Sequence, residues 1–246
     1  MLVLLPPSET KRDGGADGSR LDLASLSYPP LARPRKAAIA GLRSISRSVA
    51  ASTAALGLGP TQRFEIDRNR ALATSATMPA LERYTGVLYD AIDVETLEPA
   101  AREFLGQHVA IHSALFGLVG ADDAVPAYRF SHDTRIPGTS LAKIWREANA
   151  RVLGLEPGLV LDLRSESYVH LGPAGAGSVF LRVVSDDGSG HRRALNHFNK
   201  HGKGELVRAL GVAGVDFQSV DELTEWARSA GINLAPGAPG ELDLVV

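Results

Sequence analysis

The sequence predicts a single α/β domain in which helices flank a mixed β-sheet. Two observations support this fold class. Strand-like apolar runs and helix-like periodic segments are interspersed along the chain, without the strict strand–helix–strand rhythm of an all-parallel sheet. At 246 residues, 44% of them hydrophobic, the chain can also bury one sizeable core. We therefore expect residues 1–246 to form one domain.

The N-terminal part begins with a strand, a loop and a helix. Leu2–Leu5 is a continuous apolar run ended by two prolines, which is typical of a buried strand. Residues 12–30 are rich in Gly, Asp and Ser, and we expect a mobile loop there. A helix from about Arg35 to Leu56 follows, and Gly57 ends it.

Two segments in the middle of the chain can be interpreted in more than one way. Pro79 and Pro99 each stand near the start of a further helix. Residues 84–89 carry aromatic side chains and indicate a strand or a turn. Residues 108–119 show the alternating pattern that predicts a strand, although the same run could continue a helix.

The remaining elements are more strongly patterned. Leu141–Leu153 is amphipathic, and Ser140 before it is a typical helix N-cap. Leu159–Leu163 and Val179–Val184 are short apolar runs that predict strands. Leu223–Ala230 predicts the last helix.

Composition excludes several classes of site. The chain has no cysteine, which excludes disulfides, thiolate nucleophiles, Cys-bound zinc and iron–sulfur clusters. His108 and His112 are four residues apart, but no glutamate follows the first, so the metallohydrolase pattern is missing. We expect no metal and no cofactor. No apolar run approaches the length of a membrane span, and the N-terminus lacks signal-peptide character, so we expect a cytoplasmic protein without a membrane partner.

The charge pattern is more informative than the net charge of −2. Residues 191–210 set five Lys and Arg residues against one acid, Glu205, and contain Gly202-Lys203-Gly204. Gly-x-Gly predicts a turn that opens a helix, where free N–H groups and the helix dipole bind phosphate. Residues 193–199 could be a helix, which would complete a helix-hairpin-helix-like basic element, or a strand. The predicted phosphate-binding residues are Arg192, Arg193, Lys200, His201, Gly202, Lys203, Gly204 and Arg208.

Lys36, Arg43 and Arg47 form a second basic face, on the helix predicted from Arg35. It is either a solvated face or a surface that touches a polyanion.

Polar side chains cluster where predicted strands end, the place at which open α/β sheets bind ligands. Ser8 and Lys11 follow the first strand, and Asp162, Arg164 and Glu166 share a face if the later strand continues. The alternative is a structural Arg–carboxylate network. Tyr128 and Arg129 could stack on a base, grip a phosphate or pin a loop to the core. We expect one cleft to contain Ser8, Lys11, Tyr128, Arg129, Arg164, Ser165, Glu166 and Tyr168.

Seven segments in order resemble landmarks of the YaaA family, the bacterial peroxide-stress proteins. They are Leu4–Lys11, Tyr84–Tyr89, His112–Leu118, Val125–Arg129, Leu141–Trp145, Asp162–Tyr168 and Phe198–Gly204. The resemblance implies a single-domain α/β fold with a positively charged cleft, DNA binding through a helix-hairpin-helix-like element, and protection against iron-linked peroxide damage. The motif residues that carry over are Tyr128, Arg129, Ser165, Tyr168, Lys200, Lys203 and Gly204.

Two functional hypotheses follow. The first is a non-enzymatic protein of the oxidative-stress response that binds duplex DNA without sequence specificity. The alternative is an enzyme acting on a nucleotide or nucleobase-like small molecule at the strand-end cluster. A long, open basic groove would favour the first, and a closed concave pocket with an apolar wall would favour the second.

Overall fold

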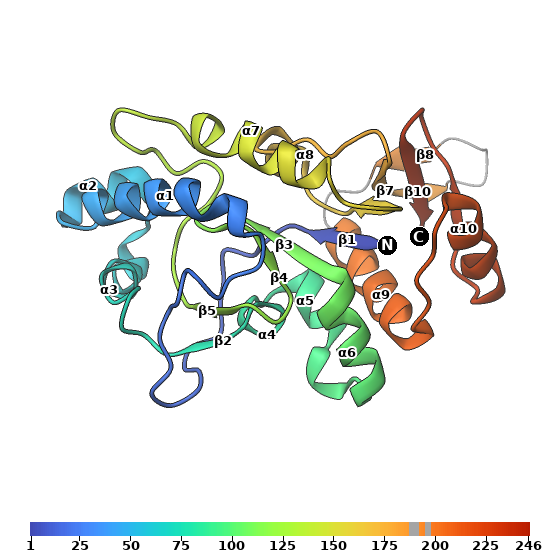
Figure 1. Ribbon diagram of the computed structural model, residues 1–246, viewed down its shortest axis with the longest axis horizontal. Coiled ribbons are helices and arrows are strands. Elements are labelled where there is room, and N and C mark those ends of the chain that lie inside the picture. Colours follow the sequence, from blue (N-terminus) through green and yellow to red (C-terminus); the bar gives the residue numbers. More distant parts are fainter. Residues whose placement is uncertain (187–191, 195–197) are drawn as a thin grey trace.

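The computed structural model describes residues 1–186, 192–194 and 198–246 (Figure 1). In this part of the chain, eight strands form one mixed sheet in the order β4-β3-β1-β6-β7-β10-β9, with β8 paired to β7. The strands are β1 (Leu2–Leu5), β3 (Val109–Ser113), β4 (Gly117–Gly120), β6 (Val160–Asp162), β7 (Ser178–Asp186), β8 (Arg192–Ala194), β9 (Leu234–Pro236) and β10 (Glu241–Val245). A small second sheet pairs β2 (Thr77–Pro79) with β5 (Ala124–Pro126). The predicted mixed sheet is confirmed.

β1 lies in the parallel centre of the main sheet. It pairs in parallel with β3 on one side and with β6 on the other, so that Leu4 aligns with both Ala110 and Asp162. Every residue of β1 is buried, which explains why the strand is a continuous apolar run instead of an alternating one. The carboxyl ends of β1 and β6 therefore meet at the same edge of the sheet.

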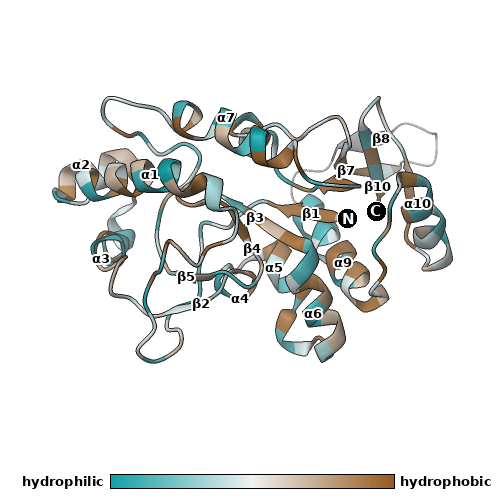
Figure 2. Cartoon of the chain, viewed as in Figure 1, coloured by the Kyte–Doolittle hydropathy of each residue, from teal (hydrophilic) through white to brown (hydrophobic). Residues whose placement is uncertain are grey.

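Helices cover both sides of this sheet. They are α1 (Ala32–Ile45), α2 (Val49–Leu56), α3 (Phe64–Arg70), α4 (Ala80–Arg83), α5 (Val87–Ile92), α6 (Pro99–His108), α7 (Leu141–Leu153), α8 (Glu166–His170), α9 (Phe198–Ala213) and α10 (Val220–Ser229). Short 3-10 helices span Pro29–Leu31, Pro60–Gln62 and Val94–Thr96. Figure 1 shows α7 and α8 on one side of the sheet and α5, α6 and α9 on the other. In Figure 2, hydrophilic stretches lie on the outer helices α7 and α10.

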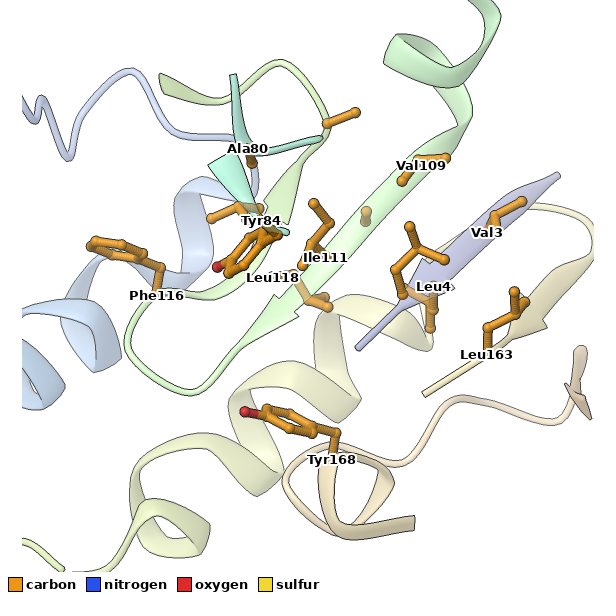
Figure 3. Close-up of a cluster of buried hydrophobic side chains, with 14 of the residues drawn as sticks. Val3, Leu4, Ala80, Tyr84, Val109, Ile111, Phe116, Leu118, Leu163 and Tyr168 are labelled. Carbon is orange, nitrogen blue, oxygen red and sulfur yellow. The ribbon is translucent and has the colours of Figure 1, made fainter. Parts of the chain in front are cut away.

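The hydrophobic core gathers around the centre of the sheet. Val3 and Leu4 of β1, Ile111 of β3 and Leu163 after β6 are fully buried. Figure 3 shows these side chains together, with the aromatic ring of Tyr84 close by. This core fixes the strand ends from which the candidate site is built.

Most predicted elements are confirmed, with several differences. Residues 108–119, expected as one strand or as the continuation of a helix, contain two antiparallel strands, β3 and β4. The predicted helix from Arg35 to Leu56 is two helices, because Ser48 acts as a new N-cap and accepts a hydrogen bond from the N–H of Ala51 at 3.3 Å. Residues 87–92 form α5, not a strand or a turn. The helix begins after Gly86, whose φ of 99° suits glycine, and Asp90 accepts the N–H of Gly86.

The interpretation of Gly202-Lys203-Gly204 as a turn is wrong, because all three residues lie inside α9. Gly204 allows α9 to pack closely against α5, because a Cβ at this position would lie 2.2 Å from the carbonyl oxygen of Leu88. Residues 192–194 form a strand, β8, so the helical alternative fails for them, and residues 191 and 195–197 lie outside the described part. A helix-hairpin-helix element is therefore not confirmed.

Residues 12–28 contain no helix and no multi-residue strand, as expected of a loop. Hydrogen bonds fasten the loop at both ends. Arg83 donates to the carbonyl oxygen of Gly14 at 2.9 Å, and the backbone N–H of Ser27 donates to Asp123 at 3.0 Å. Its mobility stays a prediction. Among the described residues, no helix combines the length and the apolar character that a bilayer crossing requires.

Candidate functional site

A cavity of about 550 Å³ opens where β1 and β6 end. Five segments far apart in the sequence line it. They are residues 6–10 after β1, 85–89 at the start of α5, 130–132, then Leu163, Ser165 and Tyr168 after β6, and finally Asn199, Lys200 and Lys203 of α9. The carboxyl end of parallel strands is where open α/β sheets bind ligands. A cavity therefore lies at the strand ends, where the sequence predicted the cleft.

The start of α9 supplies the positive side of the cavity. The first N–H groups of a helix have no acceptor within the helix, and its dipole is positive at this end. Asn199 and Lys200 stand in this first turn, and the Lys200 side chain is exposed. The Oδ1 atom of Asn199 is buried without a hydrogen-bond partner among the described residues. Anionic groups are favoured at such a helix end.

Lys203 lies one turn further along α9 and is only 5% exposed. Its Nζ donates a hydrogen bond of 3.0 Å to the carbonyl oxygen of Leu163 and lies 5.4 Å from the centre of the Phe180 ring. Burial lowers the pKa of Lys203 from its ordinary 10.5 to about 8, with Asp162 opposing that shift and Arg182 adding to it. The cavity thus holds one hydrated lysine and one desolvated lysine.

The segment Ser8–Thr10 forms another part of the cavity rim, and two buried basic side chains support it. Lys11 donates to the carbonyl oxygens of Ser8 and Glu9 at 2.9 and 3.3 Å, and Arg129 forms an ion pair with the Glu9 carboxylate. Burial lowers the pKa of Lys11 from 10.5 to about 7. Neither side chain is among the cavity-lining residues, so both support the rim instead of facing a ligand.

A chain of buried hydroxyls stands beneath this rim. Tyr128 shares hydrogen bonds of 2.6 Å with the hydroxyls of Tyr84 and Ser113, and the Lys11 Nζ lies 4.1 Å from the centre of the Tyr128 ring. Burial raises the pKa of both tyrosines. Of the options open for Tyr128 and Arg129, fastening of a loop matches their contacts. Tyr128 packs edge-on against Phe116 in the core and does not line the cavity, so its predicted place in the cleft is wrong.

The family profile described as "Peroxide stress protein YaaA" matches residues 1–236. The chain belongs to this family. A UPF0246 protein of Corynebacterium efficiens is 42% identical over 253 residues, which cover 100% of both chains. A UPF0246 protein of Streptomyces coelicolor is 37% identical over 260 residues, covering 100% of this chain and 98% of the relative. A more distant UPF0246 protein, from Lactobacillus delbrueckii, is 29% identical over 174 residues, or 68% of this chain and 69% of its own.

Four of the seven YaaA-like segments contribute residues to the cavity wall. They are Leu4–Lys11, Tyr84–Tyr89, Asp162–Tyr168 and Phe198–Gly204. Tyr168 is 6% exposed, and its ring lies 5.5 Å from that of His132, another lining residue. Ser8, Ser165, Tyr168, Lys200 and Lys203 are therefore the predicted site residues that the structure brings together.

Arg164 does not line the cavity, because it is completely buried in a structural network. Its Nη2 and Nε donate to the Asp162 carboxylate at 2.6 and 2.8 Å, and its Nη1 lies 2.8 Å from Nδ1 of His112. Burial, with a smaller contribution from Arg164, holds the pKa of His112 well below its ordinary value. The prediction that Arg164 belongs to the cleft is wrong, and the alternative Arg–carboxylate network is what the structure contains.

Other predicted residues also lie away from the cavity. Glu166 is exposed on α8 and pairs with Arg182 at 3.3 Å, because β6 ends at Asp162 and the expected alternation does not continue. Arg208 donates to the carbonyl oxygens of Ile92 and Asp93 at the end of α5. His201 is exposed and lies 3.4 Å from Glu205.

Gly202 and Gly204 are interior to a helix, so their N–H groups are not free ends. The backbones of Arg192 and Arg193 lie in β8, and their side chains are outside the described part.

Lys36, Arg43 and Arg47 line a separate groove of about 540 Å³ along α1, together with Leu21, Ile39 and other residues. They do not contribute to the cavity at the strand ends. The structure therefore keeps the two predicted basic surfaces apart.

The wall formed by residues 85–89 was not predicted from the residue pattern. Tyr89 fastens it to the rim, since its hydroxyl donates to the carbonyl oxygen of Pro6 at 2.7 Å. Gly86 faces the hydroxyls of Ser8 and Thr10, which would lie 3.4 Å from a Cβ at this position. The sequence signal for this wall was a glycine between two tyrosines, but that pattern does not indicate which residues the segment packs against.

Proposed function

We propose that this YaaA-family protein acts in peroxide stress by binding duplex DNA without sequence specificity, with a phosphate group at the start of α9. The observation that supports the proposal is the opening of a helix N-terminus, with Lys200 and Lys203, into a cavity at the carboxyl ends of β1 and β6. Lysine and backbone N–H groups contact phosphates whatever the base sequence.

The shape of the cavity limits how DNA would bind. A volume of about 550 Å³ falls within the range of pockets for small ligands and is far too small to enclose a duplex. The duplex would therefore lie across the mouth of the cavity, with one backbone phosphate at the start of α9 and neighbouring phosphates at the rim near Lys200. Such binding would cover backbone that peroxide and iron otherwise attack, which is the protective role we propose.

The affinity for duplex DNA, measured by fluorescence anisotropy over a series of salt concentrations, tests this proposal. Because binding releases about one counterion per phosphate contact, Lys200→Ala should weaken binding and lower the slope of log affinity against log salt by about 1. Lys143→Ala is the matched control, since Lys143 is exposed on α7 and does not line the cavity. Equal losses in the two variants would remove the assignment of this site.

One observation favours a second candidate, an enzyme acting on a nucleotide or nucleobase-like small molecule. The cavity is concave, and part of its wall is apolar, formed by Val87, Leu88, Phe130 and Leu163. Calorimetric titration with nucleoside monophosphates separates the candidates. Saturable binding of a free nucleotide, with no salt-dependent binding of duplex DNA, would favour the enzyme.

A further inference from the structure

Lys203 is more deeply buried than phosphate binding requires. A phosphate can be held by the exposed Lys200 and by the N–H groups of the first turn of α9, whereas burial of Lys203 costs solvation energy. Within the described part of the chain, its Nζ donates a hydrogen bond to an uncharged carbonyl oxygen, that of Leu163. When the amine of a lysine is shielded from water at the wall of a cavity, its neutral form is favoured, and this form is a nucleophile.

We propose that Lys203 forms an imine with an aldehyde group of a phosphate-bearing ligand whose phosphate lies at the start of α9. This inference rests on the proposed phosphate site and adds a covalent step to it. The ligand class is an open-chain sugar phosphate, either free or as the abasic unit of a DNA strand.

The spacing on α9 suits such a ligand. Lys200 and Lys203 are three residues apart and both line the cavity. Side chains at this spacing share a helix face, with Cβ atoms about 5–6 Å apart. A phosphate beside Lys200 and an aldehyde beside Lys203 would thus be separated by a few bonds, as they are in a five-carbon sugar phosphate.

The contacts of Lys203 also prepare it for attack. The carbonyl oxygen of Leu163 fixes the position of Nζ, and the Phe180 ring shields it. The charged groups that act on it from the neighbouring strands are Asp162 of β6 and Arg182 of β7. Asp162 is already paired with Arg164 at 2.6 Å, so its carboxylate is not free to hold the Lys203 ammonium.

Imine formation between Lys203 and the aldehyde needs no other reactant. The lone pair of the neutral Nζ attacks the aldehyde carbon, and the carbonyl π electrons move to oxygen, giving a carbinolamine after proton transfer. The C–O bond then breaks and a C=N bond forms. The oxygen leaves as water, carrying both hydrogens of the amine. The lowered pKa of Lys203, about 8, increases the neutral fraction that this step requires near neutral pH.

Borohydride trapping tests the proposal. The full chain is incubated with deoxyribose 5-phosphate or with a duplex oligonucleotide that contains one abasic site, and sodium borohydride is added. The reduced imine is a stable secondary amine, and it adds the mass of the ligand less one oxygen atom, because water is lost and two hydrogens are gained. Peptide mapping of the wild-type protein should place this mass on Lys203. Duplex without an abasic site is the blank.

Two variants test separately the amine that reacts and the lysine that binds the phosphate. Lys203→Met should reduce the trapped adduct to the blank level, and Lys200→Ala should slow trapping several-fold while leaving the modified residue unchanged. An adduct with either probe on Lys203 supports the proposal, and the probe that reacts identifies the source of the aldehyde. No adduct with either probe, or an adduct on another lysine, overturns it. Duplex binding without trapping would overturn this inference alone, whereas trapping without duplex binding would overturn the proposed DNA binding.

Discussion

Replacement of Gly204 by alanine tests whether α9 packs on α5 through this glycine. The new Cβ would lie 2.2 Å from the carbonyl oxygen of Leu88 and 2.7 Å from the Cβ of Ala91. A backbone oxygen cannot rotate away, so the two helices must separate. Overpacking of this kind costs about 1–3 kcal/mol, and here the upper end applies. Alanine also recovers about 1 kcal/mol of helix propensity, which leaves a net loss of about 2 kcal/mol.

Gly202→Ala is the matched control for this variant. Its Cβ would meet the side chain of Val246 at 3.3 Å, a contact that a side chain can relieve. The propensity gain then dominates, and the variant should be as stable as the wild type or up to about 1 kcal/mol more stable. Urea unfolding followed by circular dichroism measures both. Equal stabilities of the two variants would refute the packing argument, and a large loss in both would point to a turn at residues 202–204.

Two further predictions concern the buried charges. Arg164→Met should cost about 3–5 kcal/mol of unfolding free energy in urea, because it leaves Asp162, 3% exposed, as an unpaired buried charge. Arg182→Met removes only a partly exposed partner and should cost about 1 kcal/mol or less, so equal losses would show that Arg164 is not buried as described. Between pH 7 and pH 10.5 the unfolded chain holds the Lys11 proton and the folded chain does not, so this residue makes stability rise with pH across that window. Unfolding free energies at several pH values should show a smaller rise in Lys11→Met than in the wild type, and an unchanged rise would refute the burial of a neutral Lys11.

The strand-end part of the site was predictable from the sequence. An apolar run ended by two prolines identifies β1 as a buried strand, and the residues after such a strand must lie at the ligand-binding edge. Ser8 and Tyr168 were placed correctly in the cavity for this reason, and because the segments that carry them resemble the YaaA family.

The rest depends on contacts between distant segments. Nothing in the local sequence says that Gly204 touches Leu88, so Gly202-Lys203-Gly204 had the same local pattern as a turn. Arg164 lies two residues from its partner Asp162, but its burial is decided by His112 and Gly172, which come from elsewhere in the fold. A pattern of cations shows where charge is concentrated and does not show which side chains are desolvated.

Binding of DNA at the start of α9 can be tested by recording backbone amide shifts by NMR during titration with duplex DNA. We expect the largest shifts at Asn199 and Lys200 in the first turn of α9, with smaller ones at Ser8 and Tyr168. Shifts concentrated around Lys36, Arg43 and Arg47, with α9 unaffected, would contradict this site and would assign DNA to the separate basic groove.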